Sequence, residues 1–236
     1  MIINQATDLG EEVLKKNLQY KGFMGISIRH MFFSRHTMLQ YFLWISQHFN
    51  DFRIILMDDP DKYNLMVFKG LNEADALAKA YEISENIKKG YLRILEHYKI
   101  TNIKILQFKE FSLEPDYLRI LKLVQEYMLV DSKFKDELLV LMEKNIGDRI
   151  ESFSKEQNLS SDQLTNIKNI LSQYIIEEIA FIIYMTENGF PIEIDPTTEF
   201  STKKMLYENV FPVLAEKIHL SRRGHIYIFP EGTQYK

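Results

Sequence analysis

The chain of 236 residues contains no cysteine, so disulfides, thiolate zinc sites, iron–sulfur clusters and cysteine nucleophiles are all excluded. Glycine and proline are scarce, at 9 and 6 residues, which argues against long flexible linkers. The longest apolar run, residues 175–185, carries two glutamates and is too short to cross a membrane. The first twelve residues lack a basic start followed by an apolar stretch, so they do not form a secretory signal. We therefore expect a cytoplasmic protein with no membrane partner.

The composition is that of a globular protein. Hydrophobic residues make up 46% of the chain, which is ample for a core and excludes a disordered tail. The length favours a single domain covering residues 1–236. Lys and Arg number 29 against 33 Asp and Glu, a net charge of −4, so any contact with nucleic acid must come from a local basic patch.

Strand-like and helix-like segments alternate in the first half of the chain. The expected strands are Lys21–Ile28, Arg53–Met57 and Asn102–Phe108, with a further short extended segment at Leu65–Phe68. The expected helices run from a cap at Ser34 to Phe49 and from a cap at Asn72 to about Lys99. This order implies parallel strands joined by crossover helices.

The second half is mainly helical. The expected helices are Pro115–Leu129, Lys133–Ile146, Ser161–Thr186 with a cap at Ser160 or Ser161, and Ser201–His219, followed by a closing strand at His225–Phe229. The sequence therefore predicts an α/β fold, with one doubly wound domain, a mainly parallel sheet and additional helices packed on it.

Polar residues follow the expected strands, where ligands bind in open α/β sheets. Ser27 ends the first strand, Asp58 follows the second and Lys109 follows the third. Gly25, two residues before Ser27, leaves room for a substrate against the backbone. A lone serine at a strand end is usually a turn or cap residue. The hydrolase elbow Gly-x-Ser-x-Gly is absent, because an arginine stands two residues after Ser27.

Tyr174 and Glu178 are four residues apart on one expected helix, a spacing that places them on the same face. Their neighbours are apolar, which indicates a buried helix, and a buried carboxylate needs a partner or a chemical role. Burial would raise the pKa of such a glutamate and suit it to acid–base work. Periodicity alone equally allows both side chains to face solvent at the helix edge.

No metal or cofactor is expected. His30, His36 and His48 do not share a helical face at the spacing of metal ligands. The chain has no Gly-x-Gly-x-x-Gly and no phosphate-loop motif, so nothing indicates a dinucleotide or a nucleoside triphosphate.

The long helix carries positive charge at Lys88, Lys89, Arg93 and Lys99. Such residues are usually a solvated helix face. They are also the best place on this chain for a phosphate backbone to bind.

Several of these segments together resemble one known family. The stretch Phe23-Met-Gly25-Ile-Ser27, followed by Phe32-Phe33-Ser34, is similar to the N-terminal motif of tRNA-dependent cyclodipeptide synthases. The pair Tyr174-x-x-x-Glu178 resembles the family's second signature, and the segment Gly224–Pro230 resembles its last strand. The resemblance covers roughly residues 18–231.

The resemblance implies a monomeric Rossmann-like fold similar to the catalytic domains of class I tyrosyl- and tryptophanyl-tRNA synthetases. It implies two aminoacyl-tRNA substrates per cycle, no ATP, and a cyclic dipeptide, a 2,5-diketopiperazine, as product. By position Ser27 would be the nucleophile, forming aminoacyl- and then dipeptidyl-esters in a ping-pong mechanism. Tyr174 and Glu178 would hold the ammonium of the first aminoacyl group, and Glu178 would help deprotonate the second amine.

The resemblance also implies a pocket for the first amino acid and a surface for tRNA. The pocket residues would be Phe23, Gly25, Ile55, Met57, Phe108 and Phe181, a mostly apolar wall. The basic residues Lys88, Lys89, Arg93 and Lys99 would bind tRNA. His30, Glu193 and Asp195 would line a second, more open site and favour a polar or charged partner.

Two positions depart from the family pattern. His30 replaces a marker asparagine, which indicates the group of the family marked X-Tyr-Pro. The expected Tyr-Pro pair is Asp195-Pro196 here. Either the loop aligns differently, or Asp195 stands where the tyrosine proton relay would be.

Two other functions remain open from the sequence. One is an α/β serine acyltransferase or hydrolase that uses Ser27 with His30. The other is a non-catalytic module that binds aminoacyl-tRNA through the basic helix.

Overall fold

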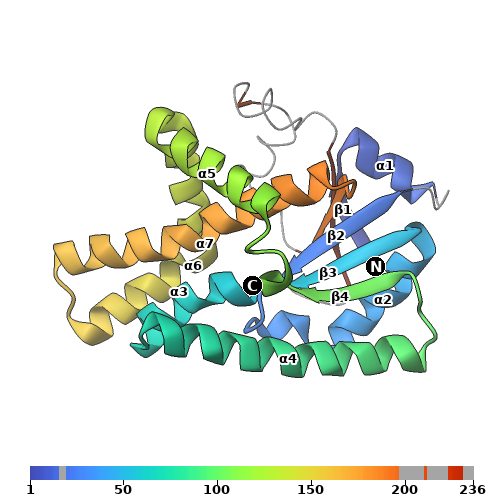
Figure 1. Ribbon diagram of the computed structural model, residues 1–236, viewed down its shortest axis with the longest axis horizontal. Coiled ribbons are helices and arrows are strands. Elements are labelled where there is room, and N and C mark those ends of the chain that lie inside the picture. The colour runs from blue at the N-terminus through green and yellow to red at the C-terminus, as the bar shows by residue number, and fades with distance from the viewer. Residues whose placement is uncertain (16–19, 197–209, 212–222, 231–236) are drawn as a thin grey trace.

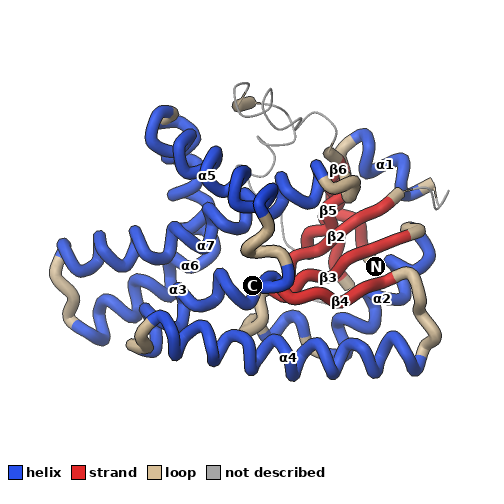
Figure 2. Tube along the Cα trace, in the orientation of Figure 1, coloured by secondary structure: helices blue, strands red, loops and turns tan. Residues whose placement is uncertain are grey.

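The computed structural model describes residues 1–15, 20–196, 210–211 and 223–230. It contains a six-stranded sheet with the order β1-β6-β5-β2-β3-β4 (Figures 1 and 2). The strands are β1 (Ile2–Ala6), β2 (Lys21–Ile26), β3 (Asp51–Leu56), β4 (Ile103–Gln107), β5 (Ile192–Asp195) and β6 (Gly224–Phe229). Every neighbouring pair is parallel except β1 with β6. The predicted α/β fold with a mainly parallel sheet is therefore confirmed.

Helices surround the sheet and extend beyond it. They are α1 (Asp8–Leu14), α2 (Arg35–His48), α3 (Asp58–Lys69), α4 (Glu73–His97), α5 (Pro115–Val130), α6 (Ser132–Gln157) and α7 (Ser161–Glu187), with short 3₁₀ turns η1 (Met31–Phe33) and η2 (Phe108–Glu110). Figure 1 shows α3, α5, α6 and α7 grouped on one side of the sheet and α4 along the lower edge. None of the helices in the described ranges is long and apolar enough to span a membrane. The helix expected at Ser201–His219 lies outside the described residues except at positions 210–211.

Side-chain caps fix the starts of three predicted helices. The side chains of Ser34, Asn72 and Ser160 accept hydrogen bonds from backbone N–H groups three residues later in the chain, at 3.4, 2.9 and 3.3 Å. Each cap satisfies one of the N–H groups that the first helical turn leaves without a partner. The caps expected at these positions are confirmed.

The prediction of an extended segment at Leu65–Phe68 is wrong, because these residues belong to α3. The cluster Asp58-Asp59-Pro60, which suggested a turn, is the first turn of this helix. Acidic side chains stabilise a helix N-terminus, and proline is tolerated there because its missing N–H has no helical partner. The helix ends at Gly70, whose φ of +65° suits a residue without Cβ.

Two apolar cores cover the two faces of the sheet. Met24 and Ile54 belong to the core that includes residues of α2 and α4, whereas Phe23 and Ile55 belong to the core formed with α5, α6 and α7. Successive residues of a strand point to opposite faces, so the alternation along β2 assigns each residue to one core. Phe23, Gly25 and Ser27 therefore lie on the α7 side.

The strand order changes direction at β2. From β2 the chain continues to β3 and β4 on one side, and it later adds β5 and β6 on the other. In open α/β sheets, ligands bind beyond the carboxyl ends of the two strands at such a switch point. Ser27 follows β2 and Asp195 ends β5, so both stand at this edge of the sheet.

Candidate active site

Ser27 is the first residue beyond β2 and is half-buried. Its carbonyl accepts a hydrogen bond from the N–H of His30 at 3.2 Å, so the chain turns immediately after the strand. The N–H of Met57 donates to the carbonyl of Ile26 at 3.0 Å, which holds the ends of β2 and β3 together. Ser27 thus follows a strand end that is hydrogen-bonded to the neighbouring strand end.

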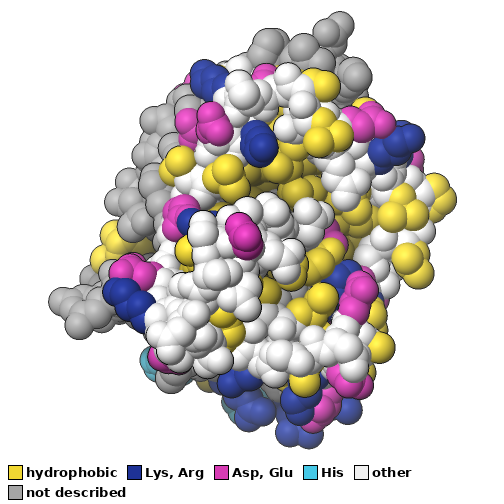
Figure 3. Space-filling view, turned by 90° about the vertical axis from the view of Figure 1, so that its left-hand side faces the viewer, with side chains coloured by type: hydrophobic (Ala, Val, Ile, Leu, Met, Phe, Trp, Pro, Cys, Tyr) yellow, Lys and Arg dark blue, Asp and Glu magenta, His cyan; other side chains and the backbone are white. Residues whose placement is uncertain are grey.

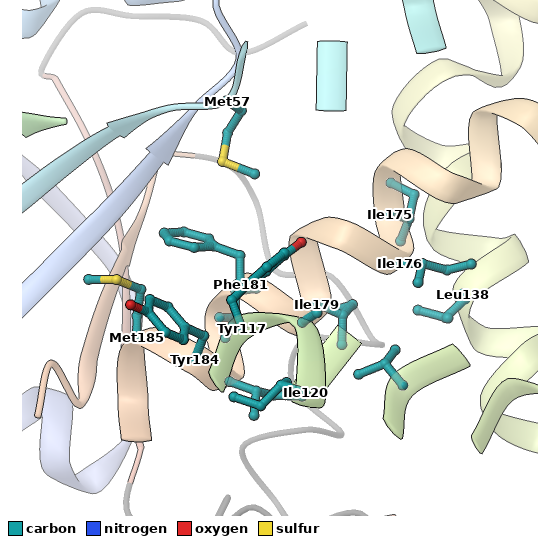
Figure 4. Close-up of a cluster of buried hydrophobic side chains, with 14 of the residues drawn as sticks. Met57, Tyr117, Ile120, Leu138, Ile175, Ile176, Ile179, Phe181, Tyr184 and Met185 are labelled. Atoms are coloured by element: carbon teal, nitrogen blue, oxygen red, sulfur yellow. The ribbon is translucent and has the colours of Figure 1, made fainter. Parts of the chain in front are cut away.

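A wall of apolar side chains lies beside Gly25, two residues before Ser27. A Cβ placed on Gly25 would lie 3.6 Å from Met57 Sδ and 3.9 Å from Phe181 Cε1, so these two side chains face the bare backbone of Gly25. Figure 4 shows Met57 reaching from the end of β3 toward Phe181 on α7. The ring of Phe181 lies 5.5 Å from that of Phe23 and 5.7 Å from that of Phe108. Ile55 belongs to the same apolar core. All six predicted pocket residues therefore lie on the same face of the sheet.

Tyr174 and Glu178 lie on α7, about two turns and one turn before Phe181 respectively. Both are half-buried, and Tyr174 packs against the apolar core that contains Phe181. The alternative in which both point fully into solvent does not apply. The helix therefore presents a phenol and a carboxylate near the apolar pocket.

Glu177, whose side chain is 12% exposed, is a largely buried carboxylate that was not among the predicted site residues. It accepts a hydrogen bond from Tyr63 Oη at 2.7 Å, and Lys62 Nζ lies 3.9 Å away. Burial raises the pKa of Glu177, while the hydrogen bond from Tyr63 and the charge of Lys62 oppose the rise. Two adjacent glutamates in an apolar run were visible in the sequence, but only Glu178 matched the family spacing.

Asp58 and Lys109, the polar residues after β3 and β4, form part of a buried network. Asp58 accepts hydrogen bonds from Ser84 Oγ at 2.8 Å and from the N–H of Lys109 at 3.1 Å, and Gln107 Nε2 donates to Ser84 Oγ at 2.5 Å. Asp58 is fully buried, and this burial raises its pKa. The network ties both strand ends to α4 and so fixes the neighbouring pocket residues Met57 and Phe108.

Asp195 lies in a buried polar cluster, not on an open site. Glu193 and Asp195 are each 4% exposed and lie on the α7 face, since Ile192 and Ile194 belong to the opposite core. His225 from β6 is fully buried, with Nδ1 3.3 Å from Glu193 Oε2 and Nε2 3.9 Å from Asp195 Oδ2. The expectation that Glu193 and Asp195 line a more open surface is therefore wrong. Their carboxylates face His225, which the sequence predicts in the last strand but does not link to either residue.

His30 is separate from that cluster. It caps η1, and its Nδ1 accepts a hydrogen bond from the N–H of Phe32 at 3.2 Å. This bond occupies one ring nitrogen, and nothing among the described contacts joins the ring to the hydroxyl of Ser27. The arrangement gives no support to a Ser27–His30 dyad.

The four basic residues predicted to bind tRNA differ in their surroundings; three of them lie on α4, and Lys99 lies two residues beyond its end. Lys88 pairs with Glu110 at 2.6 Å, and Lys89 lies 3.7 Å from Glu85. Arg93 and Lys99 are exposed and have no ion pair in the described part of the chain. Figure 3 shows Lys and Arg side chains, mixed with Asp and Glu, at the lower edge of the molecule where α4 runs in Figure 1. The predicted tRNA surface is thus partly neutralised at Lys88 and Lys89 and open at Arg93 and Lys99.

No group of three or more histidine or acidic side chains is arranged to hold a metal ion in residues 1–15, 20–196, 210–211 and 223–230. The chemistry that this site can supply comes from a hydroxyl, two half-buried or buried glutamates, phenols and an apolar pocket.

Comparisons with known proteins agree with this arrangement. The structure resembles a cyclodipeptide synthase from Bacillus thermoamylovorans with a TM-score of 0.74 and 18% identity, covering 94% of each chain. A cyclodipeptide synthase from Candidatus Glomeribacter gigasporarum bound to Phe-tRNAPhe matches with a TM-score of 0.70 and 15% identity, covering 96% of this chain and 94% of that one. The tyrosyl-tRNA synthetase of Archaeoglobus fulgidus matches with a TM-score of 0.58 and 10% identity, over 95% and 60% of the two chains. The expected likeness to class I synthetases is thereby confirmed.

Sequence comparison gives the family itself. No curated protein sequence matches the chain. The family profile described as cyclodipeptide synthase, however, matches residues 5–187, well over half of the chain. The chain therefore belongs to the cyclodipeptide synthases, aminoacyltransferases that make cyclic dipeptides from aminoacyl-tRNAs.

Proposed function

We propose that this cyclodipeptide synthase carries both aminoacyl groups of its product on Ser27, first as an aminoacyl ester and then as a dipeptidyl ester. The observation that carries the proposal is the place of Ser27, directly after β2 at the switch point of the sheet and two residues beyond the apolar wall that faces Gly25. Family membership supplies the substrate class, and the position of Ser27 supports its role as the nucleophile.

The first step is an ester exchange. Ser27 Oγ attacks the carbonyl carbon of the aminoacyl ester, a new C–O bond forms, and the 3′-terminal oxygen of the tRNA leaves with the proton from the hydroxyl. One ester replaces another, so the reaction needs positioning more than driving force. The side chain of this first amino acid packs against Phe23, Met57 and Phe181, which favours a flat or bulky residue.

The second step forms the peptide bond. Tyr174 and Glu178 hold the ammonium of the bound aminoacyl group, and Glu178 takes its proton. The amine formed in this way attacks the ester carbonyl of the second aminoacyl-tRNA, a C–N bond forms, and the 3′-terminal oxygen of that tRNA leaves, so the dipeptide stays on Ser27. Glu178 then helps to deprotonate the second amine for ring closure. A half-buried carboxylate near an apolar pocket is a suitable partner for an ammonium group. The free amine of the dipeptidyl ester then attacks the ester carbonyl, the C–O bond to Ser27 breaks, and the cyclic dipeptide leaves.

We assign the chain to the X-Tyr-Pro-like group, with Asp195 at the position of the relay tyrosine. The burial of Asp195 beside His225 supports a role in proton transfer during ring closure, since titratable groups buried together are costly to keep. The protein is proposed to act in the cytoplasm as a monomer that uses two aminoacyl-tRNAs per cycle and binds them through Lys89, Arg93 and Lys99.

The proposed function is tested by expression in bacteria and mass spectrometry of the culture medium. We expect diketopiperazines that contain at least one apolar or aromatic residue, and none above background from the Ser27→Ala variant. Phe181→Ala enlarges the pocket and is expected to shift the product ratio without abolishing synthesis. A folded, soluble wild-type protein that makes no diketopiperazine would contradict the proposal.

A further inference from the structure

A pocket lies between the start of α2 and the middle of α4. Its volume is about 310 Å³, at the lower end of the range for small-molecule sites in proteins. Aromatic, apolar, polar and cationic side chains line it: Phe33, Ser34, Arg35, Asn86, Ile87 and Tyr91. None of them belongs to the apolar wall at Gly25 or to the proposed catalytic residues. The pocket is therefore a separate candidate site.

The aromatic wall of this pocket is fixed by its surroundings. Tyr91 is buried, its hydroxyl donates to the carbonyl of Phe33 at 2.6 Å, and its ring packs edge-on against Phe42 with the ring centres 5.5 Å apart. Phe33 is only half-buried, so part of this residue is accessible to a ligand. An accessible aromatic ring on a fixed backbone is a platform on which a nucleobase can stack.

Arg35 places a guanidinium group at the edge of the pocket. A Cβ on Gly90 would lie 3.0 Å from Arg35 Nε and 3.2 Å from one terminal nitrogen, so the guanidinium lies directly against the bare backbone of α4. Glycine destabilises the middle of a helix relative to alanine, and this close approach gives it a reason to be there. Arg35 is exposed, and it makes no hydrogen bond or ion pair within the part of the chain that the structure describes. Its donors are therefore available to an anion.

The positive charge continues from the pocket along α4. Arg93 comes three residues after Gly90, so the two positions adjoin on the helix surface. Asn86, four residues before Gly90, adds an amide that both donates and accepts hydrogen bonds. Single-stranded nucleic acid needs a cation for its phosphate and an aromatic face for its base, and this pocket offers both.

Two consecutive turns connect Ser27 to the pocket. The carbonyl of Ser27 accepts from the N–H of His30 at 3.2 Å, and the carbonyl of His30 accepts from the N–H of Phe33 at 3.1 Å. A turn closed by such a bond keeps its first and last Cα atoms within about 7 Å, so those of Ser27 and Phe33 are no more than about 14 Å apart. The few unpaired nucleotides at the end of a tRNA can span this distance.

We propose that this pocket binds a nucleotide of the unpaired 3′ end of the aminoacyl-tRNA, with the base against Phe33 and the phosphate on Arg35. The inference rests on the proposed role of Ser27, because that role brings the end of the tRNA to the end of β2. The ester is attached to the last ribose, so the nucleotides before it must lead from Ser27 toward the tRNA stem. The pocket adjoins both the turns that follow Ser27 and the exposed Arg93, and it holds the chain on that path.

Binding of two synthetic RNA hairpins tests the pocket without depending on catalysis. One hairpin carries the unpaired 3′ end that all tRNAs share, and the other has the same stem with a blunt end. For the wild type, removing the unpaired end should weaken binding about tenfold, the size expected for one stacked base. Arg35→Gln should weaken binding of the first hairpin by a similar factor and leave binding of the blunt hairpin nearly unchanged. Arg35 is exposed, so the variant should fold, as thermal unfolding will show.

Two further variants sharpen the test. Phe33→Leu keeps an apolar side chain and the carbonyl that Tyr91 binds but loses the aromatic face, and it should reproduce the loss for the first hairpin alone. Arg119→Gln on α5, which breaks a surface pair with Glu187 at 2.8 Å, is the matched control and should bind both hairpins like the wild type. Equal losses for the two hairpins in Arg35→Gln, or unchanged binding in both pocket variants, would overturn the nucleotide pocket.

The outcome for the pocket is distinguishable from that for the proposed function, because the hairpins are uncharged and carry no ester. A wild type that distinguishes the hairpins through Arg35 but forms no ester on Ser27 would contradict the proposed function while the pocket still stood. An ester on Ser27, together with Arg35→Gln and Phe33→Leu variants that bind both hairpins like the wild type, would overturn the pocket and leave the proposed function intact.

Discussion

Gly25 sets the room available beside Ser27. A methyl group there would meet Met57 and Phe181 at 3.6 and 3.9 Å, which are ordinary contact distances. We expect Gly25→Ala to fold with a free energy of unfolding within about 1 kcal/mol of the wild type. Because the methyl group occupies the pocket, the products should shift toward a smaller first residue. Mass spectrometry of the product mixture and denaturant unfolding check both outcomes.

Gly22 on the same strand provides the control for this substitution. A Cβ there would lie 2.6 Å from Phe49 Cε1 and 2.7 Å from Phe52 Cε2, inside the opposite core. Gly22→Ala should therefore lose roughly 1–3 kcal/mol of stability through overpacking. Its product ratio should stay that of the wild type. An unchanged product ratio in Gly25→Ala would show that Gly25 does not face the bound side chain.

Glu177 makes the stability of the protein depend on pH. Burial raises its pKa in the folded state, whereas a glutamate in the unfolded chain titrates near about pH 4.3. The stability from its protonated form is fully present below the unfolded pKa and is lost as pH rises through the folded pKa. Glu177→Gln stays neutral and can still accept the hydrogen bond from Tyr63. We expect its free energy of unfolding to fall less than that of the wild type between about pH 5 and 8.

Glu151→Gln is the matched control for the pH series. Glu151 is exposed, and a hydrogen bond from Lys155 lowers its pKa, the opposite direction to Glu177. The contribution of Glu151 to stability is lost as pH falls. Glu151→Gln should therefore not flatten the plot of unfolding free energy against pH above about pH 5. Parallel curves for the wild type and Glu177→Gln would refute the account of Glu177.

At the scale of elements, the network around Asp58 joins α3, α4 and the end of β4. Ser84 accepts from Gln107 and donates to Asp58, so Ser84→Ala removes both bonds and leaves a buried carboxylate with fewer donors. We expect a loss of about 1–3 kcal/mol in the free energy of unfolding, measured by urea denaturation. At low temperature, where the variant stays folded, Gln107 and Asp58 should keep their positions. The ratio of cyclic dipeptide products should therefore be that of the wild type. Ser154→Ala on α6 is the control and should be nearly neutral, since Ser154 is only half-buried and its side chain is not part of this network.

Most helices could be predicted because their signals are local. Caps at Ser34, Asn72 and Ser160 and apolar periodicity lie within a few residues of each other in the chain. The start of α3 was misread because Asp-Asp-Pro occurs both in turns and in first helical turns. Only the packing of α3 against α4 and α7 decides between these two structures.

β5 could not be predicted in this way. Its pattern Ile-Glu-Ile-Asp alternates apolar and acidic residues, as in a strand with one solvent face, yet all four residues are buried. Glu193 and Asp195 are buried because His225, about thirty residues later, lies beside them on β6. The pocket shows the same limit of prediction from local sequence. Taken one at a time, Phe23, Met57 and Phe181 are typical core residues. Only the resemblance to the family placed them in one pocket before the structure was known.

At the scale of the whole molecule, an acidic protein must bind an acidic polymer through a local surface. The exposed charges of α4 should carry this binding, whereas Lys88 is already paired with Glu110. We expect Arg93→Gln to weaken tRNA binding and to lower the slope of log affinity against log salt by nearly one. Lys88→Gln should do so much less. Filter binding over a series of salt concentrations measures both, and equal effects of the two variants would contradict the assignment.

The fold positions Ser27 by its topology. The change of direction between β2 and β5 makes this edge of the sheet the expected ligand site, and apolar residues of α7 pack on the same face of the sheet as Gly25. The alternation of strands and helices predicted a doubly wound sheet, but the order of its strands follows from pairings between segments as distant as β2 and β5. That order makes a single serine at a strand end into a candidate nucleophile.

The ester on Ser27 is the claim on which the account of catalysis rests, and intact-protein and peptide mass spectrometry test it directly. The wild type is mixed with one aminoacyl-tRNA, quenched in acid and digested. We predict a mass increase of one aminoacyl group on the peptide that contains Ser27, and no adduct in Ser27→Ala, whose unfolding curve should match that of the wild type. An adduct that persists in Ser27→Ala, or a wild type that releases cyclic dipeptide without ever carrying an adduct on Ser27, would contradict the account.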